Sequence, residues 1–277
     1  MDYMRAHGKR LMPSMIYGTA WKKEETANLV YQALKEGFRG IDTAGQPRHY
    51  NEKLVGVGIE KAINENIIKK EDLYIQTKFT PLDGQDKNNM PYLESDDLKT
   101  QITKSFENSK KNLKTNYIDS YLLHSPVFPG KRLIEAWQVI QEFYYEKQIG
   151  KLGICNCYDL DILKYLFKYS EVKPLIVQNR FYAQTDYDKE IRSWCNDMGI
   201  TYQSFWSLTA NPELVNSPVI IELANKYNKT NEQIFYKFLN EIDIVPLNGT
   251  TSQEHMKLDL NDFRLEEGEI VTINTLL

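Results

Sequence analysis

The chain has few cysteines, no excess of positive charge and no long apolar run, and each of these shortages excludes a class of protein. Three cysteines among 277 residues cannot all pair with one another and are too few for a disulfide scaffold, which fits a reducing compartment. A formal net charge of −4 gives no basic surface of the kind that binds nucleic acid or anionic lipid. No stretch approaches the roughly 18 uninterrupted apolar residues of a membrane helix, and residues 1–15 lack a signal-peptide core. We therefore expect a soluble cytoplasmic protein whose partners are small molecules.

The length of the chain allows one domain or two. At about 150 residues per domain, 277 residues fall between the two, but α/β barrels commonly form one unit of this size. No Pro-rich or Gly/Ser-rich linker divides the chain. The least regular segment, 81–91, is expected to be a long loop, either a binding element or a plain surface insertion. We expect a single domain over residues 1–277.

Short strand-like runs alternate with longer stretches of helical periodicity along the whole chain. The expected strands are 15–20, 39–44, 73–79, 118–125, 151–156, 175–181, 201–206 and 244–247. The expected helices are 24–37, 51–66, 95–113 with Ser95 as its N-cap, 133–148, 159–169, 188–198, 217–227, an extra one at 231–242, and a final one starting near Ser252. Eight strand–helix units in a row predict an α/β fold, and a closed (β/α)8 TIM barrel rather than an open doubly wound sheet.

Three consecutive strands each carry an ionisable residue near their C-terminal ends. These are Asp42, Lys78 and His124, and Tyr50 follows in the loop after the second strand. Active sites of α/β barrels lie at this end, so the four side chains are expected around one cavity. Each of them alone has a structural explanation, such as a stabilising Asp–Lys pair or a hydrogen-bonded histidine in the core. Their coincidence favours a catalytic site.

This set of side chains suits the protonation of a carbonyl oxygen. The ammonium of Lys78 is expected to lower the pKa of the Tyr50 phenol from its ordinary value of about 10. Asp42 would keep the lysine charged and oriented, and the His124 imidazole would donate a hydrogen bond to the substrate oxygen. Reduction of the carbonyl carbon also needs a hydride. No side chain supplies one, so a cofactor is implied.

Several short motifs closely resemble those of the aldo-keto reductase family. They are GTAW at 18–21, IDTA at 41–44, HYNEKLVG at 49–56, TKF at 77–79, LLHSP at 122–126, LGICN at 152–156, VQNRFY at 177–182 and NGTTSQEHM at 248–256, and they span essentially the whole chain. The resemblance implies a monomeric barrel enzyme that reduces aldehydes or ketones to alcohols with NADPH or NADH. The family's catalytic residues would correspond to Asp42, Tyr50, Lys78 and His124.

The same resemblance implies a cofactor site. The nicotinamide carboxamide would contact Cys155, Asn156 and Gln178, and the nicotinamide ring would stack on Phe205. The remaining cofactor residues would be Ser207, Leu208, Gly249, Thr250, Thr251 and His255. Barrel enzymes often bind phosphate at a helix start after the eighth strand, although an ordinary helix N-cap explains this segment equally well. The residues expected to line the substrate pocket are Trp21, His124 and Phe128.

Three departures from the family pattern affect these expectations. The loop between Ala44 and Tyr50 is longer by several residues, so a differently shaped loop must deliver the tyrosine. Cys155 stands where the family has serine, and a thiol is a weak hydrogen-bonding group. Gly249 and His255 replace the family's lysine and arginine beside the adenosine 2′-phosphate, which weakens the expected discrimination against NADH. NADPH remains the expected cofactor, with NADH as the alternative.

Two other functions stay open at this point. The lengthened loop before Tyr50 also fits a regulatory or sensor protein that keeps the fold and the nucleotide but has little turnover. A barrel aldolase would form a Schiff base on Lys78, because burial lowers the pKa of a lysine, although the surrounding tetrad argues against this. Cys155 and Cys157 are interpreted as packing residues, and no metal site is expected.

Overall fold

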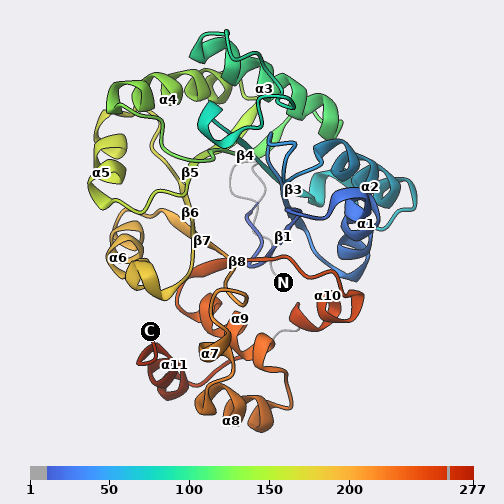
Figure 1. Cartoon of the computed structure of the whole chain (residues 1–277). Helices are drawn as coiled ribbons and strands as arrows, with labels where there is room; N and C mark the ends of the chain where they lie inside the picture. Colours follow the sequence, from blue (N-terminus) through green and yellow to red (C-terminus); the bar gives the residue numbers. More distant parts are fainter. Residues whose placement is uncertain (1–10, 261–262) are drawn as a thin grey trace.

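Eight parallel strands form a closed barrel in the computed structural model, which describes residues 11–260 and 263–277 (Figure 1). The strands are β1 (Ile16–Gly18), β2 (Gly40–Asp42), β3 (Tyr74–Phe79), β4 (Ile118–Leu123), β5 (Ile149–Cys155), β6 (Ile176–Arg180), β7 (Thr201–Phe205) and β8 (Ile244–Asn248). Neighbours in the chain are neighbours in the sheet, and β8 closes the barrel by pairing Leu247 with Ile16 of β1. The prediction of a (β/α)8 TIM barrel is confirmed.

The helices lie outside the strands and form the outer layer (Figure 1). They are α1 (Thr26–Glu36), α2 (Glu52–Asn64), α3 (Leu98–Leu113), α4 (Gly130–Tyr145), α5 (Leu160–Tyr169), α6 (Lys189–Asp197), α7 (Pro212–Val215), α8 (Pro218–Tyr227), α9 (Asn231–Glu241), α10 (Gln253–Asp259) and α11 (Glu267–Asn274). The predicted cap Ser95 is wrong, because α3 begins after Asp97, whose carboxylate accepts a hydrogen bond from the Thr100 backbone at 2.7 Å. The short helix α7 and the last helix α11 were not predicted. None of the helices in the described part of the chain is long and apolar enough to cross a membrane.

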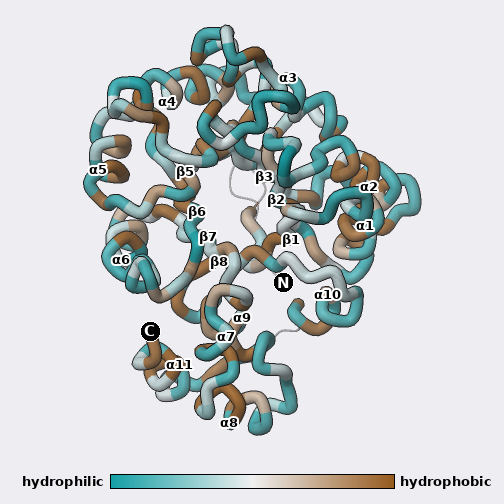
Figure 2. The backbone as a smooth tube through the Cα atoms, viewed as in Figure 1, coloured by the Kyte–Doolittle hydropathy of each residue, from teal (hydrophilic) through white to brown (hydrophobic). Residues whose placement is uncertain are grey.

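Apolar side chains fill the layer between the strands and the helices. The tube in Figure 2 shows apolar positions recurring along the helices among hydrophilic ones. In the layer under α3 and α4, Phe106 stacks on Phe143 at 4.2 Å and meets Tyr121 edge-on at 5.0 Å between ring centroids. Burial of apolar surface such as these rings is the main favourable contribution to folding. This packing lies between strands and helices, whereas active sites of barrel enzymes lie at the carboxyl ends of the strands.

The interior of the barrel contains a hydrogen-bonded network of buried amides below Asp42. The Gln76 amide donates to Asp42 Oδ1 and to Gln203 Oε1, both at 2.7 Å, and Gln178 donates to the same Gln203 oxygen at 2.8 Å. These side chains come from β2, β3, β6 and β7, so the network connects opposite walls of the barrel. Buried polar groups satisfied in this way favour one side-chain arrangement, and here they orient the Asp42 carboxylate toward Lys78.

Candidate active site

A cavity of about 750 Å³ opens at the carboxyl ends of the strands. It is lined by Asp42, Tyr50, His124 and Trp21, and by all of the expected cofactor residues except Thr251. Lys78 lies behind this wall, fully buried, and the ring of Phe128 is 62% exposed and does not reach the cavity. The structure therefore brings together residues that lie as far apart in the chain as Gly18 and Asp259.

Asp42 and Lys78 form a buried ion pair at the base of this cavity. The Lys78 ammonium donates to Asp42 Oδ1 at 2.7 Å, to Asp42 Oδ2 at 2.6 Å and to the Thr43 carbonyl at 2.9 Å. A lysine ammonium has three N–H donors, and all three are engaged in these bonds. A buried charge needs this compensation, and the bonds hold the ammonium in one position beneath the Tyr50 ring, 5.4 Å from its centroid.

The Tyr50 phenol is half-buried in the cavity wall and stays protonated at neutral pH. Burial raises the pKa of Tyr50 well above its ordinary value, and the nearby Asp42 carboxylate and Cys155 thiol act in the same direction. The sequence-based expectation was a lowered pKa. The difference arises because the Asp42 carboxylate offsets much of the effect of the Lys78 charge and occupies its donors, so that desolvation dominates at the phenol. A phenol in this state retains a proton that it can donate.

His124 follows β4 and faces Tyr50, with 5.9 Å between ring centroids. Burial lowers the pKa of His124 well below 6.5, and the positive charges of Lys78 and His49 lower it further, so the imidazole is neutral. Its Nδ1 lies 2.6 Å from the Thr80 hydroxyl. Thr80, just past β3, was not predicted as a site residue; its position two residues after Lys78 is the signal that places it at this end of the barrel.

The lengthened loop 45–49 is folded against the barrel by specific hydrogen bonds. The Gln46 amide donates to the Gly84 carbonyl at 2.5 Å, and its oxygen lies 2.9 Å from His49 Nδ1. The backbone N–H of Tyr50 donates to the Gln46 carbonyl at 3.0 Å, and the His49 ring packs on Trp21 at 4.0 Å between centroids. The extra residues thus turn back on themselves and present Tyr50 to His124.

The expected carboxamide site is built at the ends of β5 and β6. Asn156 has a positive φ of 54°, and its amide donates to the His124 carbonyl at 2.8 Å. The Cys155 thiol donates to Gln178 Oε1 at 3.3 Å. The bond from Asn156 thus joins the residues expected to bind the carboxamide directly to His124, which is expected to orient the substrate.

The segment after β8 carries a positive charge that the sequence motifs did not reveal. Lys22, at the far end of the chain, donates its ammonium to the Gly249 carbonyl, and burial lowers its pKa. Ser252 caps α10 by accepting from the His255 backbone N–H at 3.3 Å. Lys22 thus places a cation beside the position where the family resemblance calls for lysine and this chain has Gly249.

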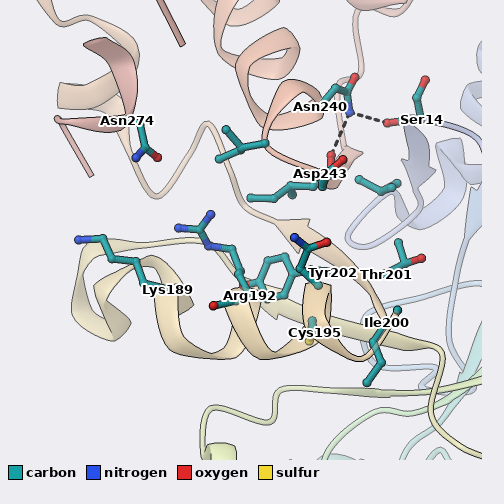
Figure 3. Close-up of a pocket in the computed structure, with 16 residues that line it drawn as sticks. Ser14, Lys189, Arg192, Cys195, Ile200, Thr201, Tyr202, Asn240, Asp243 and Asn274 are labelled. Atoms are coloured by element: carbon teal, nitrogen blue, oxygen red, sulfur yellow. Dashed lines mark hydrogen bonds between the residues drawn. The ribbon is translucent and has the colours of Figure 1, made fainter. Parts of the chain in front are cut away.

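A second cavity, of about 690 Å³, lies at the opposite end of the barrel near the starts of β7 and β8 (Figure 3). Arg192 and Lys189 from α6 face it, as does Asn240, whose amide donates to the carbonyls of Ser14 and Ile244 at 2.8 and 3.0 Å. It contains none of the expected catalytic residues. The amino ends of barrel strands usually serve stability, so we place the chemistry in the first cavity.

Comparisons with known proteins agree with this architecture. The chain is 32% identical over 254 residues to the uncharacterized oxidoreductase YtbE of Bacillus subtilis (strain 168), covering 91% of this chain and 84% of that protein. It is 30% identical over 271 residues to the methylglyoxal reductase DkgA of Escherichia coli (strain K12), covering 96% and 90%. A crystal structure of an aldo/keto reductase from Brucella melitensis superposes with a TM-score of 0.80 at 25% identity, covering 99% of each chain. A model of the Aldo/keto reductase family matches residues 14–277, and the chain therefore belongs to that family.

Proposed function

We propose that this protein reduces the carbonyl group of small aldehydes or ketones to alcohols, with NADPH as the hydride source and Tyr50 as the proton donor. Membership of the family identifies the chain as an NAD(P)H-dependent oxidoreductase. The observation that carries the finer proposal is the protonated Tyr50 beside the neutral His124, above the Asp42–Lys78 pair, in one cavity. A cytoplasmic monomer with a single domain stays a prediction from the sequence.

The residues present fit a dinucleotide. The ring of Phe205 forms part of the cavity wall, and beyond it the open backbone of Gly249 has only the Lys22 ammonium near its missing side chain, at 3.9 Å. Asn156 and Gln178 would bind the carboxamide, while Lys22, Thr250 and His255 would face the phosphates. The bound cofactor supplies a hydride to the carbonyl carbon. Lys22 supports NADPH as the preferred form, because it adds the charge that Gly249 lacks.

The side chains complete the reaction by handling the oxygen. Tyr50 donates its proton to the carbonyl oxygen as negative charge develops there, and His124 donates a hydrogen bond that orients the same oxygen. The Lys78 ammonium lies beneath the Tyr50 ring, where its charge favours the phenolate that remains after proton transfer. Asp42 keeps that ammonium in place.

The structure also bears on the two alternatives. A Schiff base requires a lysine that meets the substrate, and Lys78 is fully buried with its three donors engaged, which argues against an aldolase. A sensor without turnover was suggested by the lengthened loop. This loop nevertheless presents Tyr50 to His124, which supports an enzyme.

The substitution Tyr50→Phe tests the proposal. Loss of the proton donor should lower turnover of methylglyoxal and simple aldehydes, followed by cofactor absorbance, on the order of 10³-fold. Titration of cofactor fluorescence with NADPH and with NADH should give dissociation constants within a few-fold of those of the unchanged protein. Tyr145→Phe, on the exposed surface of α4, is the matched control. Undiminished turnover in Tyr50→Phe would refute the assignment, and tight nucleotide binding with no turnover in the unchanged protein would favour the sensor.

A further inference from the structure

Arg180 is the last residue of β6 and lines the candidate active-site cavity. Its guanidinium lies over the Trp206 ring at 4.2 Å and over the Tyr182 ring at 5.1 Å, measured to the centroids. Its Nε is buried and has no hydrogen-bond partner, and across residues 11–260 and 263–277 no carboxylate forms an ion pair with it. A charged side chain therefore packs against aromatic rings in the cavity wall, and its buried Nε–H has no acceptor among the described residues.

This arrangement differs from that of the other cations of the cavity region. Lys78 is neutralised by Asp42, and Lys22 donates to the Gly249 carbonyl. A guanidinium presents its N–H donors in a planar fork that matches the oxygens of a carboxylate. A buried donor without a partner is costly, so an oxyanion that accepts from the Nε–H of Arg180 is the ligand that the geometry favours.

The position of Arg180 points to the substrate side of the cavity. It follows Gln178 by two residues on the same strand, so both side chains face the barrel interior, and Arg180 lies about 7 Å nearer the mouth. Its backbone N–H donates to the Tyr158 hydroxyl at 3.1 Å, and this hydroxyl donates to Asn156 Oδ1 at 3.3 Å. Asn156 in turn donates to the His124 carbonyl at 2.8 Å. The backbone of Arg180 is thus joined through Tyr158 and Asn156 to His124, the residue that faces Tyr50.

We propose that Arg180 binds the carboxylate of the carbonyl substrate, and that the preferred substrates are small aldehydes or ketones that carry a carboxylate. The proposal rests on the reductase function proposed above. A phosphate of the cofactor has the same oxyanion chemistry. The residues expected to meet the phosphates, Gly249 and Thr250, follow β8, whereas Arg180 ends β6 beside the carboxamide residues, which favours the substrate as the source.

Matched pairs of substrates test the assignment in the full-length protein. Succinic semialdehyde is compared with butanal, and 4-carboxybenzaldehyde with benzaldehyde, by kcat/KM from cofactor absorbance. Arg180→Met should lower kcat/KM for the carboxylate member of each pair on the order of 10- to 100-fold, and change the neutral member less than about 3-fold. Arg180→Lys keeps the charge without the planar fork, and its kcat/KM for the carboxylate substrates should lie between those of the unchanged protein and Arg180→Met. Arg132→Met removes the same charge at an exposed position of α4 outside the cavity, and it should leave kcat/KM unchanged for both members of each pair.

Two further measurements separate the possible outcomes. If Arg180→Met weakens NADPH binding in a fluorescence titration and lowers both members of a pair equally, the arginine serves the cofactor phosphate and the proposal is overturned. If the unchanged protein reduces no aldehyde, the proposed function fails, and calorimetry then tests the site by itself. Succinate should bind the NADP⁺-loaded protein more tightly than succinamide, and Arg180→Met should abolish the difference. Equal binding of the two compounds to the unchanged protein would overturn the carboxylate site.

Discussion

The Thr80 hydroxyl contacts one of the two nitrogens of His124, and this contact bears on which nitrogen is available to a substrate. The imidazole is neutral because burial lowers its pKa, so only one of its nitrogens carries a proton. The Thr80 hydroxyl lies 2.6 Å from Nδ1. If the hydroxyl donates to Nδ1, the proton resides on Nε2, which then donates a hydrogen bond to a carbonyl oxygen. In that arrangement the tautomer is set by a residue that does not itself line the cavity.

We predict that Thr80→Val lowers kcat while leaving nucleotide binding unchanged. Valine keeps the volume of threonine but removes the hydroxyl, so the imidazole loses its preferred tautomer and orientation. The expected loss in kcat is on the order of 10- to 100-fold, comparable to the loss of other partners that orient a functional histidine. Thr80→Ser, which restores a hydroxyl, should recover most of the activity. An equal loss in both variants would show that Thr80 acts only through packing.

The loop between β2 and α2 shows how an element can be lengthened without displacing its functional residue. The Gln46 side chain connects the loop to Gly84, and Gln85 donates to the Gly45 carbonyl at 2.7 Å. The loop after β2 is therefore tied to the loop after β3, which contains the irregular segment 81–91. Gly84 and Gln85 in this segment thus support the loop that carries Tyr50, and the two interpretations given for 81–91, a binding element or a surface insertion, stay predictions.

We predict that Gln46→Ala lowers kcat/KM by reducing the fraction of molecules with Tyr50 in place. The variant loses the bonds to Gly84 and His49, each worth about 1 kcal/mol, which corresponds to a loss in activity of roughly 5-fold if one of them holds the loop and about 30-fold if both do. The loss in kcat/KM would be measured from initial rates of cofactor oxidation at saturating NADPH and varied aldehyde concentration. Arg48→Ala, in the same loop and exposed, should change turnover little. Unchanged kinetics in Gln46→Ala would mean that the loop is held by its backbone alone.

The order of strands and helices is predictable from the sequence because each strand–helix unit has its own local apolar period. Errors occur where local signals compete or are weak. Ser95 and Asp97 are both good caps, and only the contact with Thr100 distinguishes them. Four-residue α7 is too short to show a period, and α11 has no clear apolar face.

The positions of the candidate catalytic residues at one end of the barrel were predictable from strand ends and motifs, whereas their hydrogen-bond partners were not. Thr80 meets His124 across 44 positions of the chain, and Lys22 meets Gly249 across 227. The first contact depends on the pairing of β3 with β4 and the second on the closure of the barrel by β1 and β8, and no local pattern encodes either. The lowered pKa expected for Tyr50 was wrong for the same reason, since burial and the full engagement of Lys78 are properties of the assembled cavity.

At the scale of the whole molecule, burial of neutral His124 couples the stability of the barrel to pH. The pKa of His124 is well below 6.5 in the folded chain and returns to about 6.5 on unfolding. Between these values the unfolded chain binds a proton that the folded chain does not. The contribution of neutral His124 to the free energy of unfolding is therefore fully present above about pH 6.5 and is lost as the pH falls toward the pKa of the folded chain.

We predict that the free energy of unfolding falls more steeply between pH 7.5 and 5.5 in the unchanged protein than in His124→Gln, by about 1 kcal/mol, as measured by urea unfolding. Asp259 acts with the opposite sign: burial raises its pKa to about 6, so its contribution to stability is lost as the pH rises through that value. Both proteins contain Asp259, and its effect cancels in the difference. Identical pH dependence in the two proteins would mean that the pKa of His124 is the same in the folded and the unfolded chain, and the lowered pKa assigned to its folded state would then be wrong.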